Sequence, residues 1–192
     1  MPIVTESQLI STYNSLNRSF AKSFSETSQP LHEAKSQGKV TIFLSHSHSE
    51  KQYIEYAAGI LGRAGLDVHV TVYVDWRDAS MPVVTSGITA AQLKERIKEN
   101  KKFILLASSN AIKSNWVNWE LGYGDSFKYI NHIALFPFIK SGDTSWKDAE
   151  YLQIYPYIEK EDRIGYFSND VSDWNVVFPN RQKTKLSNWL KL

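Results

Sequence analysis

The stretch Val40-Thr-Ile-Phe-Leu44, followed by Ser45-His-Ser-His-Ser49, gives the first indication of the architecture. A short run of apolar and β-branched residues with no alternation predicts a strand buried on both faces, as in the centre of a parallel sheet. A helix is predicted to open at Ser49, with Gln52 completing a capping box, and to end at Gly65. Its inner face would hold Ile54, Ala57, Ala58 and Leu61.

Three further apolar segments occur at spacings that leave room for helices between them. Residues 66–74 alternate strictly between apolar and polar, which predicts a strand half open to solvent or near a sheet edge. The continuous runs Phe103–Ala107 and Ile133–Ile139 predict two more strands, the second tolerating Pro137 only near its end. Weaker patterns predict a fifth strand at 163–167 and a closing helix at 185–190.

Two helices are predicted between these strands. One would start at a capping box formed by Thr89 and Gln92 and turn Leu93 and Ile97 inward. The other would be capped by Ser114 and run to about Lys128. The resulting βαβαβαβ order predicts an α/β fold: a flavodoxin-like parallel sheet with helices on both faces.

The first 38 residues are polar and differ in composition from the rest of the chain. Within them Leu9, Tyr13, Leu16 and Phe20 recur at helical spacing, which predicts one amphipathic helix. This helix would dock on the domain behind it or form an oligomer contact, and we favour docking. The chain is therefore divided into an N-terminal helical extension, residues 1–38, and one α/β domain, residues 39–192.

The composition of the 192 residues narrows the class of protein. Apolar residues make up 42% and charged residues 22%, as in folded globular domains. A net charge of +2 gives no reason to expect nucleic acid or a membrane surface as a partner. With no cysteine, disulfides, thiolate metal sites and thiol nucleophiles are excluded. The absence of a signal peptide and of a long apolar stretch leads us to expect a cytoplasmic protein.

Several α/β families are excluded because their diagnostic motifs are missing. The first strand is followed by Ser45-His-Ser-His-Ser49 and lacks the glycine pattern of a dinucleotide-binding Rossmann unit. The chain has neither a P-loop nor the Gly-x-Ser-x-Gly elbow of an α/β-hydrolase. A receiver domain would need an acidic residue after the third strand, where Ser108 stands.

In a parallel sheet, ligands bind beyond the carboxyl ends of the strands. The residues at those ends are 45–47, 75–76 and 108–109, and a helix begins nearby at Ser114. On that helix Trp116, Glu120 and Tyr123 share one face at i, i+4 and i+7. A carboxylate among aromatic planes suits a ligand that carries a flat ring and a sugar. By spacing alone, a packed aromatic face with a solvated Glu120 is the stronger interpretation.

The order and content of these motifs resemble a bacterial TIR domain. The resemblance rests on Thr41-Ile-Phe-Leu-Ser-His46, Val72-Tyr-Val-Asp-Trp76, Phe103-Ile-Leu-Leu-Ala-Ser108 and, most specifically, Ser114-Asn-Trp-Val-Asn-Trp-Glu-Leu-Gly-Tyr123. It implies an NAD glycohydrolase, or a cyclase that makes a cyclic ADP-ribose isomer, with NAD as the substrate and no cofactor. The family's catalytic glutamate, four residues after a tryptophan, maps onto Glu120.

The same resemblance suggests which residues line the substrate pocket. These are the residues after the first strand, the start of the loop after the second, and the aromatic residues beside Glu120. We therefore expect Ser45, His46, Asp75, Trp76, Trp116 and Tyr123 to bind substrate. No metal is expected, because the pair His46 and His48, with no acidic residue or third histidine identified as a further ligand, is a weak metal signal.

Two other functions remain open. The chain could be a non-enzymatic module that signals by TIR–TIR assembly, or a hydrolase of smaller nucleosides on a similar fold. Enzyme activity and self-association are compatible. The resemblance also implies a role in defence against phage, with a separate sensor or effector protein as partner.

Overall fold

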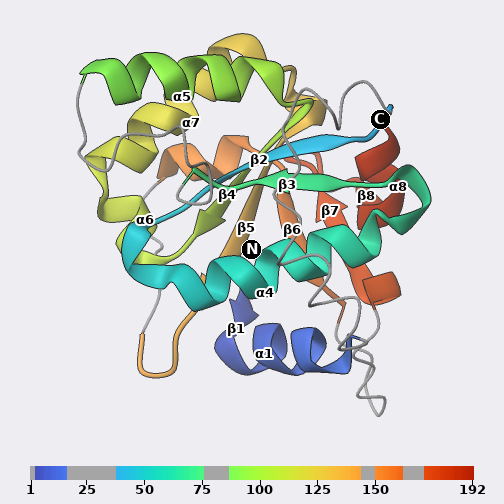
Figure 1. The fold of residues 1–192 in the computed structure, drawn as a ribbon. Coiled ribbons are helices and arrows are strands. Elements are labelled where there is room, and N and C mark those ends of the chain that lie inside the picture. Colours follow the sequence, from blue (N-terminus) through green and yellow to red (C-terminus); the bar gives the residue numbers. More distant parts are fainter. Residues whose placement is uncertain (1–2, 17–37, 76–86, 144–149, 162–170) are drawn as a thin grey trace.

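One mixed sheet runs through the protein (Figure 1). The computed structural model describes residues 3–16, 38–75, 87–143, 150–161 and 171–192. The strands lie in the order β3-β2-β4-β5-β6-β7-β8, with β1 paired to β5. Their bounds are β1 Val4–Thr5, β2 Thr41–Ser45, β3 Thr71–Tyr73, β4 Lys102–Ala107, β5 Ile133–Ile139, β6 Tyr157–Lys160, β7 Trp174–Val177 and β8 Lys183–Lys185.

Helices cover both faces of this sheet (Figure 1). Side chains from α1, α4 and α8 pack on one face, and side chains from α5, α6 and α7 pack on the other. The predicted α/β fold is confirmed. The helices are α1 Glu6–Ser15, α4 Lys51–Ala64, α5 Gly87–Glu99, α6 Ser109–Lys113, α7 Asn115–Phe127 and α8 Leu186–Lys191.

The central strands form where continuous apolar runs predicted them. Every residue of β2 and β4 is buried, and β4 pairs in parallel with β2 on one side and β5 on the other. Pro137 lies toward the end of β5 opposite Ala107, as expected. Because both faces are covered by helices, such strands carry apolar side chains on each side.

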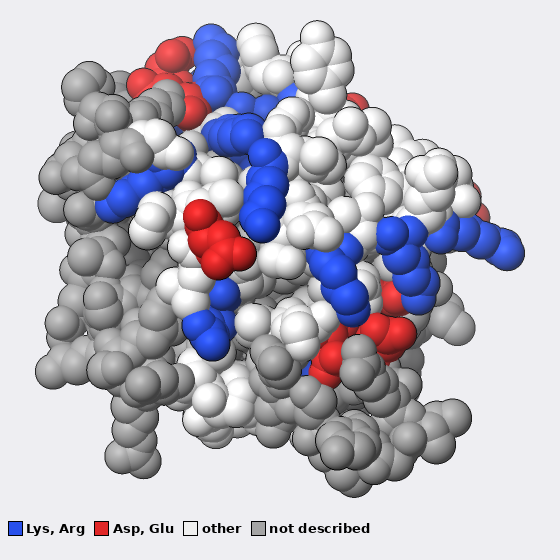
Figure 2. All heavy atoms as spheres, turned by 90° about the vertical axis from the view of Figure 1, so that its right-hand side faces the viewer, with Lys and Arg blue, Asp and Glu red and all other residues white. Residues whose placement is uncertain are grey.

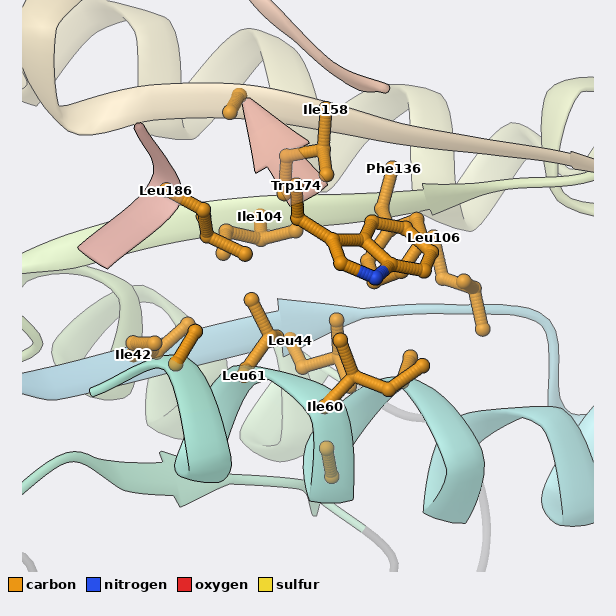
Figure 3. Close-up of a cluster of buried hydrophobic side chains, with 14 of the residues drawn as sticks. Ile42, Leu44, Ile60, Leu61, Ile104, Leu106, Phe136, Ile158, Trp174 and Leu186 are labelled. Carbon is orange, nitrogen blue, oxygen red and sulfur yellow. The ribbon is translucent and has the colours of Figure 1, made fainter. Parts of the chain in front are cut away.

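The C-terminal part of the sheet differs from the prediction. Strands β7 and β8 pair antiparallel, and neither β6, β7 nor β8 was predicted. Figure 3 shows that Trp174 of β7 packs in the same cluster as Leu44 of β2 and Ile60 and Leu61 of α4. The Trp174 and Phe136 rings lie 5.2 Å apart. The late strands thus complete the core on this face, where each large buried side chain contributes about 1.5–3 kcal/mol.

Both predicted capping boxes are wrong. Ser49 lies within a 3₁₀ turn, His48–Glu50, and α4 starts at Lys51 with no side-chain cap hydrogen bond. The Ser49 hydroxyl pairs instead with that of Ser47 at 3.0 Å. Helix α5 already begins at Gly87, so Thr89 is inside the helix. The inward residues of both helices, and the end of α4 at Gly65, are confirmed.

The strand predicted at 66–74 is shorter than its alternation suggested. Only Thr71–Tyr73 form β3, which lies at the edge of the sheet as expected. Residues Leu66–Val68 form a 3₁₀ turn that ends at His69, whose φ of 49° is left-handed. The first part of the alternating segment therefore lies in a turn and not in a strand.

The N-terminal helix docks on the domain, as we favoured. Thr5 and Gln8 form a capping box, Leu9 is fully buried, and α1 packs against α4. The Tyr13 ring lies 4.8 Å from that of Tyr56. Strand β1, which was not predicted, joins the sheet beside β5. Phe20 and the strand predicted at 163–167 lie outside the described residues, and the domain boundary at residue 38 stays a prediction.

Figure 2 looks onto the end of the sheet at which the parallel strands β2–β5 begin, on the right of Figure 1. Basic side chains are scattered over this face among uncharged ones. Lys102, at the start of β4, is buried: its Nζ donates to the Asn131 carbonyl at 3.0 Å, and burial lowers its pKa to about 7. None of the described helices has the length and apolarity needed to cross a membrane.

Two glycines offer a test of the packing around α4. A Cβ on Gly65 would lie 2.1 Å from Cγ2 of Val70, whereas a Cβ on Gly122, inside α7, would meet nothing within 4 Å. We expect Gly65→Ala to lower the free energy of unfolding by about 1–3 kcal/mol, because overpacking forces the backbone to shift. Gly122→Ala should raise it by roughly 0.5–1 kcal/mol. Urea unfolding of both variants checks this, and equal effects would contradict it.

Candidate active site

The candidate site lies where β2 ends and α7 begins. Ser45 is the last residue of β2, and the Ser114 hydroxyl caps α7 by accepting a hydrogen bond from the Val117 N–H at 3.3 Å. This cap sets the start of the helix, and Glu120 follows in its second turn. The Ser45 hydroxyl donates to Oε2 of Glu120 at 2.5 Å. Ser45 is 1% exposed and Glu120 is 3% exposed.

Burial dominates the electrostatics of Glu120. Burial, together with the smaller effect of the nearby charge of Asp75, raises the pKa of the carboxyl to about 8. Hydrogen bonds from Ser45 and Trp116 act in the opposite direction, because they stabilise the charged form. Among the described residues no salt bridge to Glu120 is found. The site therefore holds a carboxyl whose ionised form would be stabilised by a positively charged ligand.

His46 and Asp75 lie beside this pair. The buried His46 ring places Nε2 at 3.3 Å from Oδ1 of Asp75, and the exposed His48 places its Nε2 at 3.5 Å from Oδ2. The Nδ1–H of His46 donates to the Leu44 carbonyl at 2.9 Å. Burial lowers the pKa of His46, which the charge of Asp75 partly offsets. The parallel pairing of β2 with β3 brings these residues to one edge.

Aromatic rings form a continuous row along α7. The ring centroids of Trp116 and Trp119 are 5.0 Å apart, those of Trp119 and Tyr123 5.9 Å, and those of Tyr123 and Phe127 4.8 Å. The ammonium group of Lys94, on α5, lies 5.2 Å from the Tyr123 ring. The row runs between α7 and α5, so only its Trp116 end reaches Glu120.

The structure thus brings together four of the residues that the sequence singled out with Glu120. Ser45 and Trp116 act directly on its carboxyl, and Asp75 acts on it through charge and in turn contacts His46. Tyr123 packs farther along the helix, in the aromatic row. Trp76 lies outside the described residues. The substrate-binding roles of all six residues stay predictions.

Sequence reasoning missed a second buried glutamate at the same end of the sheet. Glu50, 1% exposed, accepts hydrogen bonds from the Ser108 hydroxyl and from Asn110, and its Oε1 lies 2.6 Å from Nζ of Lys140. The partners come from the ends of β4 and β5, far from Glu50 in sequence. The sequence analysis did not single out Glu50 because it lies in a polar turn, where a glutamate is ordinarily solvated.

A model of the TIR domain family matches residues 42–165. The chain belongs to the TIR domain family. The matched residues include all of β2 but Thr41, the helices α4 and α7, and the Ser45–Glu120 pair, so the sequence resemblance is confirmed.

Two curated relatives are similar to this TIR domain. The first is the "Probable 3' cyclic ADP-D-ribose synthase ThsB'" of Bacillus cereus (strain MSX-D12), 30% identical over 200 residues that cover 100% of this chain and 99% of the relative. The second is the "Putative cyclic ADP-D-ribose synthase TIR2" of Cytobacillus dafuensis, 27% identical over 85 residues. That match covers 43% of this chain and 21% of the relative.

The two buried glutamates should respond oppositely to substitution by glutamine. The pKa of Glu120 rises from 4.5 to about 8 on folding, so its contribution to stability is present below pH 4.5 and is lost as the pH rises to 8. Glu120→Gln removes this loss. We expect its melting temperature to exceed that of the wild type by roughly 2–4 °C per kcal/mol gained, at pH 8.5 but not at pH 4.5.

Glu50→Gln serves as the matched control. It leaves Lys140 facing a neutral partner, so we expect destabilisation by about 2 kcal/mol. Thermal unfolding at both pH values measures the two effects. If Glu120→Gln were as destabilising as Glu50→Gln at pH 8.5, the carboxyl of Glu120 would not be strained by burial.

Proposed function

We propose that this TIR domain cleaves the bond between nicotinamide and ribose in NAD, with Glu120 as the catalytic carboxylate. One observation carries the proposal: a buried glutamate without a cationic partner among the described residues, oriented by the Ser45 hydroxyl at the ligand-binding edge of the sheet. The relatives named as cyclic ADP-D-ribose synthases support it, because such a product is formed by releasing nicotinamide from NAD.

The chemistry of this bond explains why one carboxylate suffices. When the bond between ribose C1 and the nicotinamide nitrogen breaks, its electron pair goes to the nitrogen. The positively charged nicotinamide therefore leaves as a neutral molecule and needs no general acid. Positive charge develops instead on the ribose, as in glycoside cleavage. The ionised Glu120 stabilises this charge in a site from which water is largely excluded.

Ser45 and Trp116 have supporting roles in this proposal. The Ser45 hydroxyl donates a hydrogen bond to Oε2 of Glu120. This bond fixes the orientation of the carboxyl and leaves the other oxygen, Oε1, for the substrate. The same bond also favours the charged form that the reaction needs. Trp116 donates to the same carboxyl and adds a flat surface beside it, on which a nicotinamide or adenine ring could stack.

The product depends on what captures the ribose cation. Water would give ADP-ribose and a proton. A hydroxyl of the adenosine ribose in the same molecule would form a new C–O bond, release its proton and give a cyclic ADP-ribose isomer. We propose cyclisation, since both relatives carry the name of a cyclic ADP-D-ribose synthase. A cyclic product acting on a separate effector protein stays a prediction.

A non-enzymatic assembly module is the alternative. Such a module has no use for a carboxyl that is 3% exposed, has a pKa raised to about 8 and forms no salt bridge with any described residue. Structural sites with buried carboxylates ordinarily pair them, as Glu50 is paired with Lys140. Self-association remains compatible with enzyme activity, and we propose that both occur.

Substitution of Glu120 tests the proposal directly. We expect Glu120→Gln to reduce nicotinamide release from NAD at least about 100-fold, because the neutral amide cannot stabilise a cation. Products are identified by chromatography and mass, which also separates ADP-ribose from a cyclic isomer. Glu99→Gln, on the surface of α5, is the control and should keep the wild-type rate. A folded Glu120→Gln protein with unchanged turnover would rule out the proposed role.

The pH profile gives an independent test. Only the ionised carboxyl is reactive, and its pKa is raised to about 8 in the free protein by burial and by Asp75. We therefore expect kcat/KM to increase nearly tenfold per pH unit below pH 7 and to level off above about pH 8. Ser45→Ala removes a bond that lowers this pKa, so its profile should shift to higher pH. A flat wild-type profile between pH 6 and 9 would contradict the assignment.

A further inference from the structure

Three side chains next to the candidate active site converge on one point. They are His46 and His48, which follow β2, and Asp75, which follows β3. One ligand atom from each lies within 4.8 Å of the other two. The imidazole Nε2 atoms are 3.3 Å (His46) and 3.5 Å (His48) from separate oxygens of the Asp75 carboxylate.

The protonation of His46 prepares it to bind a cation. Its Nδ1 contacts the Leu44 carbonyl, which can only accept, so Nδ1 carries the proton. In the neutral ring Nε2 then presents a bare lone pair. This atom is buried and has no hydrogen-bond partner among the described residues. A backbone carbonyl that fixes the far nitrogen of a histidine is the usual second contact of a metal ligand.

The close approach of His46 to Asp75 also favours a positively charged group between them. A lone pair on Nε2 and a carboxylate oxygen face each other at 3.3 Å, and both are hydrogen-bond acceptors. A metal ion between the two groups would bind both lone pairs at once.

We propose that His46, His48 and Asp75 bind a divalent transition-metal ion of the zinc class, with three protein ligands and one open position. Bonds of about 2.0–2.1 Å in a tetrahedral site place ligand atoms about 3.3 Å apart. The separation of 3.3 Å between Nε2 of His46 and Oδ1 of Asp75 matches that spacing, and one ligand atom of His48 lies within 4.8 Å of both residues' ligand atoms. Two imidazoles and one carboxylate select zinc over magnesium or calcium, which prefer oxygen ligands.

This inference replaces the expectation that no metal binds. That expectation rested on the lack of an identified third ligand for the two histidines. Parallel pairing of Phe43 with Tyr73 brings the ends of β2 and β3 together and supplies Asp75. The side chain of His48 is 63% exposed, so an ion can reach the site from solvent. Ser45, the partner of Glu120, is the residue directly before His46.

Zinc binding to the chelator-treated, tag-free full chain tests the proposal without NAD, so its failure is distinct from failure of the proposed reaction. Isothermal titration with Zn²⁺ should show one ion per chain. His48→Ala removes an exposed ligand and should weaken binding at least about tenfold. His69→Asn is the matched control: His69 is exposed and has a left-handed φ of 49°, which asparagine tolerates, and its variant should bind like the wild type.

Cobalt provides a check on the coordination number. Bound Co²⁺ should give the intense visible absorption of a four-coordinate ion, and added Mg²⁺ should not displace it. The proposal is overturned if the wild type shows no saturable zinc binding, if His48→Ala binds as tightly as the wild type, or if bound cobalt shows only the weak bands of a six-coordinate ion.

Discussion

The hydrogen bond between Ser45 and Glu120 joins the centre of the sheet to the helix that covers it. Its two residues come from the end of β2 and from α7, and each is held by its own element: a fully buried strand on one side and a helix capped by Ser114 on the other. Because both elements are rigid, the carboxyl of Glu120 has a fixed position. Its burial costs stability, and that cost is the property from which its proposed chemistry follows.

Two buried glutamates at one end of the same sheet show how the environment separates structure from function. Glu50 is surrounded by Lys140, Ser108 and Asn110, so its charge is balanced and it ties together the ends of β4 and β5. In the part of the chain that the structure describes, Glu120 receives hydrogen bonds from the neutral groups of Ser45 and Trp116, and the charge that acts on it is that of the acidic Asp75. A ligand with a cationic centre would supply the missing charge. The positively charged nicotinamide ribose of NAD is such a ligand, which connects the packing of this site to the proposed reaction.

The elements that are set by burial in the core were mostly predicted from the sequence. The ends of helices and the short strands, where a turn competes with a helix or a strand, were predicted less well. The buried strands β2, β4 and β5 and the inner faces of α4 and α5 followed from apolar patterns, which are set by the core itself. The capping boxes failed because Ser49 forms a turn with Ser47 and because α5 starts earlier at Gly87. The alternation at 66–74 was misleading, because this segment forms a 3₁₀ turn followed by a short edge strand. The antiparallel strands near Trp174 carry patterns too short to distinguish from loops.

The residues of the candidate site could be predicted from the sequence, but the contacts between them could be predicted only within a single segment. Trp116 and Glu120 lie on one helix, so their spacing was visible in the sequence. The contacts of Glu50 with Lys140, and of His46 with Asp75, join residues that only the strand order brings together. Parallel pairing places the carboxyl ends of β2, β3, β4 and β5 at one edge, where side chains from separate segments meet. For that reason an apparently isolated His-x-His pair acquires a carboxylate partner, and the edge that positions Glu120 also forms the proposed metal site.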